Sequence, residues 1–208
     1  MSAEGARPDT AAASTAATAA TAAWLERAAS WRVASLLFQW QSAELVAELQ
    51  SVAREVRPEW RDEAVRLAAH PIDDWQTEYH RVLGPGGCPA SESSYDDNAL
   101  AGRGPLLARV AGFYEAFAYR PDTMTAEVPD HIANELGFLS YLSLKCAFAD
   151  YSADAGSLEV AAEAYVRFQD EHLAWWIDRL CERLDGTESP RYTAAVAWAR
   201  RVAQSGRA

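Results

Sequence analysis

Apolar residues recur along most of the chain at steps of three and four, which is the period of one face of an α-helix. The first clear stripe begins at Trp24 and continues through Leu25, Ala28, Trp31 and Phe38. No segment alternates between apolar and polar residues as a half-buried strand would. The expected helices cover residues 24–38, 42–49, 58–67, 72–83, 105–117, 129–146, 157–185 and 189–202. The pattern predicts an all-α, single-domain bundle of about eight helices.

Two stretches interrupt this pattern. Residues 1–22 are mostly Ala, Thr and Ser without an apolar stripe, so we expect a disordered tail there and a helical domain over residues 23–205. Residues 84–104 open with Gly-Pro-Gly-Gly-Cys-Pro, which cannot continue a helix. Long ordered loops in compact domains are often functional. The loop has no phosphate-binding motif, so it is a candidate for contacts of another kind.

The charge of the chain narrows the choice of partner. A formal net charge of -11 over 208 residues disfavours nucleic acid and suits a basic partner. The apolar stretches are too short to span a bilayer, so we expect no stable membrane insertion. The chain shows no secretory signal, and Cys88, Cys146 and Cys181 have no metal-site or disulfide spacing. We therefore expect a cytoplasmic protein.

One pair of residues raises the question of metal chemistry. His131 and Glu135 lie four residues apart on an expected helix, a spacing that can bind a metal or share a proton. His172 could complete a three-ligand site, which leaves a helical metalloprotein or metal-dependent hydrolase as an alternative. A buried histidine held by a carboxylate would explain the same pattern. No other residues assemble a catalytic, metal or cofactor site, so we expect a binding protein without a cofactor.

Aromatic and acidic residues offer a different kind of site. Trp175 and Trp176 are adjacent, so on a helix their side chains point about 100° apart and are difficult to bury together. One of them could line a groove for an apolar peptide, whereas ordinary core packing would explain both. Asp130 follows Pro129 at an expected helix start, where it either caps free N–H groups or points into such a groove.

Four segments together resemble one protein family. Residues 127–139 (EVPDHIANELGFL) resemble the ExPDHxxxELxFL signature of the TorD/DmsD/NarJ chaperones, which serve molybdenum oxidoreductases of the dimethyl sulfoxide reductase class. Residues 75–83 (WQTEYHRVL), 89–95 (PASESSY) and 168–175 (FQDEHLAW) resemble further family segments in order and spacing. The loop of residues 86–95 looks most like the branch that serves type II enzymes, such as ethylbenzene, dimethyl sulfide, selenate and chlorate oxidoreductases.

The resemblance implies an all-helical chaperone without enzymatic activity. It implies cytoplasmic binding of the precursor of a molybdenum (bis-molybdopterin guanine dinucleotide) oxidoreductase, through its twin-arginine leader peptide, its apo catalytic subunit or both. It further implies help with insertion of the molybdenum cofactor and a delay of export until assembly is complete. We expect the chaperone itself to be a monomer or dimer.

A leader peptide with a basic end and an apolar stretch would suit an acidic bundle with an aromatic groove. In this hypothesis Asp130 attracts the arginines of the leader, and Trp75 and Tyr79 hold its apolar side chains. His131 orients the peptide or hydrogen-bonds to its backbone. The substitution Asp130→Ala is then predicted to weaken leader binding without unfolding the chain. The predicted client-binding residues are Trp75, Tyr79, Glu92, Tyr95, Asp130, His131, Glu135, His172 and Trp175.

Overall fold

The computed structural model describes residues 10–97, 102–121 and 128–205, with only the backbone of residues 10–18. These residues form nine α-helices and no strand beyond an isolated bridge between Ser91 and His131. The helices are α1 (Thr10–Leu37), α2 (Ala43–Val52), α3 (Pro58–Ala68), α4 (Ile72–Val82), α5 (Gly104–Ala116), α6 (Ile132–Tyr151), α7 (Ala155–Phe168), α8 (Ile177–Asp185) and α9 (Pro190–Ser205). A 3₁₀ turn, η1 (Glu92–Ser94), and a π-helical segment, η2 (Gln169–Leu173), complete the described elements. The predicted all-α bundle is confirmed.

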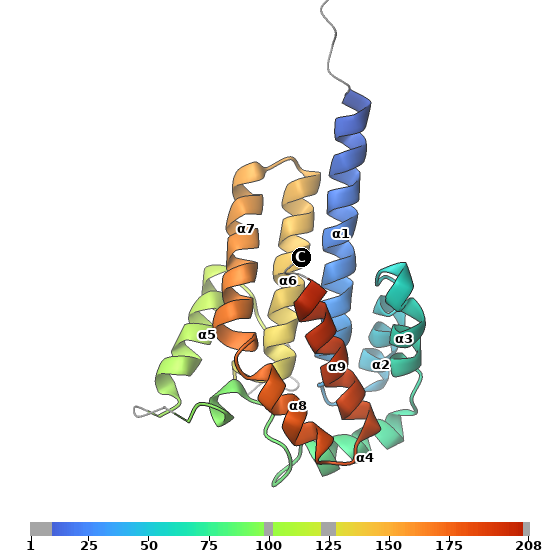
Figure 1. Cartoon of the computed structure of the whole chain (residues 1–208), viewed down its shortest axis with the longest axis vertical. Coiled ribbons are helices and arrows are strands. Elements are labelled where there is room, and N and C mark those ends of the chain that lie inside the picture. The colour runs from blue at the N-terminus through green and yellow to red at the C-terminus, as the bar shows by residue number, and fades with distance from the viewer. Residues whose placement is uncertain (1–9, 98–101, 122–127, 206–208) are drawn as a thin grey trace, which may run out of the picture.

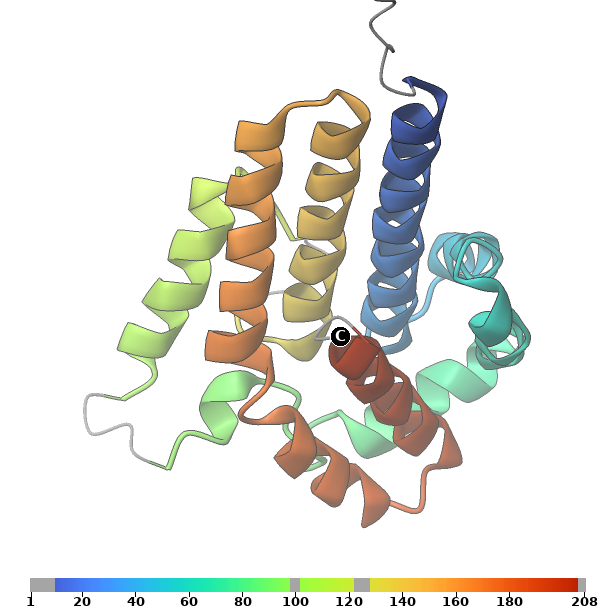
Figure 2. The same ribbon diagram turned by 45° about the horizontal axis from the view of Figure 1, so that its top comes forward.

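Three helices form the centre of the bundle. In Figure 1 and Figure 2, α1, α6 and α7 stand side by side, and α5 flanks the outer side of α7. Helices α8 and α9 lie across the lower end, whereas α2 and α3 pack on the far side of α1. Helix α6 is buried on almost every side, because its apolar residues surround the helix and do not form a single stripe. The start of α6 and the end of α7 therefore meet at the lower end, beside η1.

Helices α1 and α6 make the most extensive contact in the bundle. Their approach depends on Gly137 of α6, where a Cβ atom would lie 2.5 Å from the Tyr119 hydroxyl and 3.2 Å from Ser35 Oγ. A larger residue would have to push one of these groups aside. None of the described helices has both the length and the apolar character that a membrane span requires.

Helix α1 begins earlier than the sequence pattern predicts. The predicted disordered tail of residues 1–22 is helical from Thr10 onward, and residues 1–9 lie outside the described residues. Alanine has the highest helix propensity, so this segment forms helix without an apolar stripe. The Thr21 hydroxyl also donates a hydrogen bond to the Asp150 carboxylate at the end of α6. The described helix therefore joins the bundle before Trp24.

The single helix predicted over residues 157–185 is two helices. Segment η2 and a short turn separate α7 from α8, because the wide π-helical turn changes the direction in which later side chains point. Asp154 caps α7, since its carboxylate accepts the Ser157 N–H at 3.0 Å. Ser42 caps α2, because its Oγ accepts the Leu45 N–H at 3.3 Å.

Candidate functional site

Three buried carboxylates interact at the lower end of α6. Glu92 lies in η1, Asp130 just before α6 and Glu135 in the first turn of α6, and each is at most 1% exposed. A carboxylate without water is costly unless hydrogen bonds or charges compensate it. The partners of these three groups therefore define the structure of the site.

Glu92 joins η1 to η2. Its two carboxylate oxygens lie 3.0 and 3.3 Å from His172 Nδ1, and one of them accepts the Trp175 indole N–H at 2.6 Å. Because a carboxylate only accepts, the His172 proton is assigned to Nδ1. His172 is buried, and its ring packs 4.9 Å from the ring of Phe168 between centroids. The wide turn of η2 thus directs His172 and Trp175 to one carboxylate.

Glu135 forms a hydrogen bond with Trp176, the residue that follows Trp175. Its Oε2 accepts the indole N–H of Trp176 at 3.2 Å, and Trp176 is fully buried. Burial raises the pKa of Glu135 well above its usual value, and the charge of Glu92 raises it further. The raised pKa favours the protonated form of Glu135, whose Oε1 has no hydrogen-bond partner among the described residues. The proton reduces the cost of placing two carboxyl groups together.

Asp130 connects the loop that contains η1 to the start of α6 through hydrogen bonds. Its Oδ2 accepts the Ser93 N–H at 2.8 Å, and its own carbonyl accepts the Glu92 N–H at 2.9 Å. The Arg103 guanidinium lies 3.9 Å from Oδ1. The expectation that Asp130 points into an open groove is wrong, because the side chain is fully buried and already bonded. Asp130 instead positions Glu92.

His131 is a helix cap and does not pair with Glu135. It is the N-cap of α6, where Nδ1 accepts the Ala133 N–H at 3.3 Å. Burial lowers the pKa of His131 to about 4, so the ring is neutral at pH 7 and can accept this bond. His172 faces Glu92, and the described residues contain no group of three side chains that could hold a metal ion. The geometry does not favour the metalloprotein alternative.

Tyr95 packs against Trp176, beside the buried carboxylates. Its hydroxyl donates to the Pro89 carbonyl at 2.8 Å, and its ring lies 5.2 Å from that of Trp176 between centroids. The Cys88 sulfur is 3.6 Å from the same hydroxyl. Burial raises the pKa of the Cys88 thiol, which favours the neutral thiol form.

Trp75 and Tyr79 belong to a second aromatic cluster on α4. Trp75 is fully buried, with the Arg191 guanidinium 4.6 Å from its ring centroid. Tyr79 is half-buried and contacts Trp40 edge-on at 5.5 Å between ring centroids. Among the described residues, neither side chain has a hydrogen bond or ring contact with the three carboxylates. The structure thus does not bring these two residues together with the rest of the predicted set.

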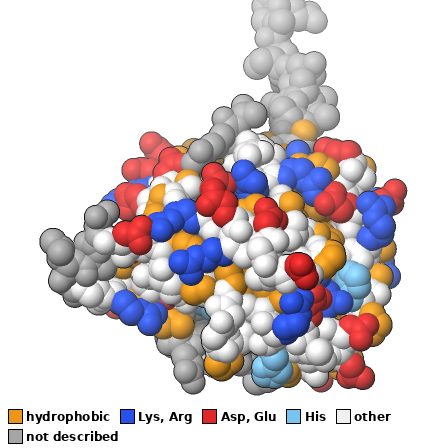
Figure 3. Space-filling model, turned by 60° about the horizontal axis from the view of Figure 1, so that its bottom comes forward, with side chains coloured by type: hydrophobic (Ala, Val, Ile, Leu, Met, Phe, Trp, Pro, Cys, Tyr) orange, Lys and Arg blue, Asp and Glu red, His pale blue; other side chains and the backbone are white. Residues whose placement is uncertain are grey.

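A polar pocket of about 320 Å³ opens beside Glu92. Trp175 forms part of its wall and is 38% exposed, and Arg179 binds the Asp97 carboxylate at 2.7 Å across from it. Figure 3 shows this lower end, where acidic and basic side chains are interspersed with hydrophobic patches. The pocket is lined by Glu92, Tyr95, Asp96, Asp97, Leu106, Arg109, Glu171, Trp175 and Arg179.

Three residues that line this pocket, Glu92, Tyr95 and Trp175, belong to the predicted client-binding residues. The other lining residues were not predicted. Helical spacing gave one usable signal, because Arg179 follows Trp175 by four residues and so shares its face. Asp96 and Asp97 follow Glu92 as a short acidic run, a pattern that is typical of a solvated loop. No sequence pattern indicated that Arg109 of α5 would face Glu171 across the pocket.

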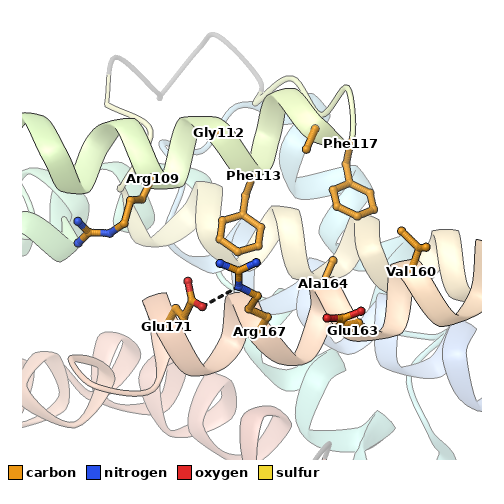
Figure 4. A pocket seen from close by; sticks show the side chains of 10 residues that line it. Arg109, Gly112, Phe113, Phe117, Val160, Glu163, Ala164, Arg167 and Glu171 are labelled. Atoms are coloured by element: carbon orange, nitrogen blue, oxygen red, sulfur yellow. Dashed lines mark hydrogen bonds and ion pairs between the residues drawn. The ribbon is translucent and has the colours of Figure 1, made fainter.

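A second pocket of about 460 Å³ lies between α5 and α7. Figure 4 shows Phe113 and Phe117 of α5 pointing toward α7, where Arg167 and Glu171 form an ion pair at 2.7 Å. Arg109 and Glu171 line both this pocket and the polar pocket, so the two pockets adjoin each other. The site therefore has a polar end with Trp175 and an apolar extension along α7.

Comparison with known families decides the classification. The model of the nitrate reductase delta subunit family matches residues 41–182, which is more than half of the chain. The chain belongs to the nitrate reductase delta subunit family. The matched range contains all nine predicted client-binding residues, and it confirms the resemblance to the TorD/DmsD/NarJ chaperones.

Two curated relatives of this family member have names that indicate a role. The chain is 32% identical over 118 residues to the selenate reductase assembly chaperone protein of Thauera selenatis. It is 31% identical over 118 residues to the chlorate reductase assembly chaperone protein of Ideonella dechloratans. Each alignment covers 55% of this chain and 59% of the relative, so the similarity spans less than two thirds of either relative.

A solved structure shares the fold. It is described as a candidate redox enzyme maturation protein from Archaeoglobus fulgidus, and it superposes with a TM-score of 0.54. The superposition covers 87% of this chain and 94% of that chain at 18% sequence identity. At this identity the similarity shows a common helical architecture.

Proposed function

We propose that this family member is a cytoplasmic assembly chaperone without catalytic activity. It binds the apo catalytic subunit of a molybdenum oxidoreductase of the dimethyl sulfoxide reductase class and leaves once the cofactor has been inserted. Family membership and the names of the two curated relatives support this proposal. The chaperone recognises the twin-arginine leader of the subunit and thereby delays its export.

The polar pocket supports a contact between particular residues of the chaperone and its client. Trp175 is the most open of the predicted residues, and carboxylates of Asp96, Asp97 and Glu171 surround it. An arginine of the client can stack on an indole face and pair with a carboxylate. Each such hydrogen bond to a charged group contributes about 1.5–3 kcal/mol when water is partly excluded, and much less when it is exposed.

The hydrogen bonds of the buried residues Glu92, Asp130, Glu135 and His172 give this pocket a fixed shape. Glu92 holds Trp175 from below, and Asp130 holds the loop that carries Glu92. A preformed pocket binds more tightly because little conformational entropy is lost on binding. In this proposal Glu92, Asp130, Glu135 and His172 act as positioning residues, and Trp175 contacts the client.

The substitution Trp175→Ala tests the proposal. We expect it to weaken binding of the purified apo catalytic subunit by about tenfold in calorimetry, whereas Trp175→Phe keeps part of the stacking surface and most of the affinity. Tyr151→Ala is the matched control, because Tyr151 is an aromatic residue 80% exposed at the other end of α6. Equal affinities for the Trp175→Ala and Tyr151→Ala variants would contradict the assigned site.

A further inference from the structure

Two pockets flank the outward side of α6 near its upper end. One has a volume of about 610 Å³ and lies between α1, α2 and α6, and the other has a volume of about 430 Å³ and lies between α5, α6 and the start of α7. In Figure 2, α2 and α5 lie on opposite sides of α6. Leu144 lines the first pocket and Phe148 lines the second. Because residues four positions apart share one side of a helix, the two pockets form one surface, which we call the α6 face.

Exposed apolar side chains gather on the α6 face. Eight large apolar side chains are exposed among the described residues, and half of them line these two pockets. They are Leu25 and Leu144, each 48% exposed, Val160, 58% exposed, and Phe148, 73% exposed. They come from three different helices, so the fold brings them together. An apolar patch of this kind on a folded protein marks an interaction surface.

The charges around the α6 face nearly cancel. The two pockets are lined by four carboxylates and three cationic side chains, so their net charge is -1, whereas the whole chain carries -11. Charges elsewhere on the surface are screened beyond about 8 Å at physiological salt. Another acidic molecule can therefore approach this face at little electrostatic cost. The charged lining residues are Glu26, Glu48, Glu55, Asp154, Arg32, Arg61 and Lys145.

The α6 face also carries charges of both signs that have no ion pair among the described residues. Lys145 is the only lysine in the sequence, and its ammonium lies 5.2 Å from the centroid of the Tyr141 ring. Glu26 and Glu55 line the pocket on the other side of Leu144, and neither has an ion pair among the described residues. In a two-fold contact the same patch of both subunits meets itself, so a patch with unpaired charges of both signs is self-complementary.

We propose that the α6 face is the contact between two copies of this chain in an isologous dimer. Apolar side chains of each copy, Phe148 and Leu144 foremost, fill the pockets of the other copy. The lysine of each copy pairs with a glutamate on the pocket rim of the other. A basic segment of a client suits this face less well, because the unpaired Lys145 lies beside its apolar residues. Trp175 is at the opposite end of α7, so the client site stays open in the dimer.

Sedimentation velocity of the purified full chain over a range of concentrations tests the contact. We expect a monomer–dimer equilibrium in the micromolar range that is typical of modest interfaces. The substitution Phe148→Glu places a charge in the apolar contact, and we expect it to weaken the dimer by about tenfold or more. Val166→Glu is the matched control, because Val166 lies on α7, is 53% exposed and lines neither pocket. We expect it to leave the dissociation constant unchanged.

Charge reversal tests the pairing across the contact. We expect Lys145→Glu to weaken the dimer by about threefold, the effect of one exposed ion pair. The double variant Glu26→Lys/Glu55→Lys should weaken it as well, although its lower net negative charge would by itself favour association. Combining all three substitutions reverses both partners and should restore the affinity. A combined variant that is weaker than each of the others would overturn the assigned pairing.

Two results would overturn the dimer itself. One is a chain that stays monomeric up to about 100 μM, where a micromolar contact would be largely formed. The other is an equal dissociation constant for the Phe148→Glu and Val166→Glu variants, which would exclude the α6 face as the contact. If the chain is monomeric and Phe148→Glu instead weakens capture of the purified apo catalytic subunit, the occupant of this face is the client. A weakened dimer with unchanged capture supports the proposal, and the chaperone function keeps its own test in Trp175→Ala.

Discussion

Glu92 connects more parts of the candidate site than any other single residue described. The substitution Glu92→Ala leaves the buried N–H groups of His172 and Trp175 without an acceptor. We expect the free energy of unfolding to fall by about 3 kcal/mol, because each N–H group left without an acceptor costs about 1–3 kcal/mol. Glu92→Gln keeps one acceptor oxygen and should cost less. Urea unfolding of the two variants checks this order, and an equal loss would show that the carboxylate bonds contribute little.

Glu135 predicts a dependence of stability on pH. Its pKa is raised in the folded protein above the ordinary value of 4.5, so between that value and the raised pKa the folded state binds more protons than the unfolded state. The stabilising contribution is complete below the unfolded pKa and is lost as pH rises through the folded pKa. Glu135→Gln cannot titrate, so its unfolding free energy should fall less between about pH 5 and about pH 8. Parallel pH profiles of the two proteins would contradict the raised pKa.

At the scale of a single residue, the sequence predicts the position of Asp130 but not its hydrogen-bond partners. The sequence places Asp130 at a helix start, and the structure confirms that position. It does not reveal that residues 89–95 fold back onto this start, because the bonds from Ser93 and Glu92 join segments about forty positions apart. The sequence predicts that Asp130→Ala weakens leader binding without unfolding the chain, and the buried bonds of Asp130 add an expected loss of stability.

At the scale of an element, the sequence does not predict the π-helical segment η2. The apolar period continues through residues 157–185, so the sequence predicted one long helix there. A π-helical turn adds one residue to a helical turn and has no composition of its own. Its effect appears only in three dimensions, where His172 and Trp175 turn to Glu92 while Trp176 reaches Glu135.

Helix α1 makes a second prediction at this scale. Ala19 and Ala20 are exposed, and its first described side-chain hydrogen bond is that of Thr21 with Asp150. Removal of residues 1–18 should therefore change the free energy of unfolding by less than about 1 kcal/mol. Removal of residues 1–30 deletes buried Ala28 and Ala29 and should cost more than about 3 kcal/mol. Urea unfolding of both truncated chains checks this, and a large loss from the shorter truncation would contradict it.

For the whole molecule, the sequence predicted the helical class and most helix positions, because amphipathic stripes and proline or glycine boundaries are local features. It did not predict which helices lie side by side. Trp75 and Trp175 both belong to family-like segments, but α4 carries Trp75 to a different aromatic cluster. The polar pocket and the pocket between α5 and α7 are lined by residues from several elements, which no single segment encodes.

The most direct test of the central claim is co-expression of the tagged chain with the catalytic subunit of its client, with and without supply of the molybdenum cofactor. Native mass spectrometry of the purified complexes shows which form of the subunit is bound. The chaperone account predicts a complex with the cofactor-free subunit, weakened by Trp175→Ala and absent once the cofactor is inserted. A stable complex with the loaded, active enzyme would contradict it and would identify the chain as a permanent subunit.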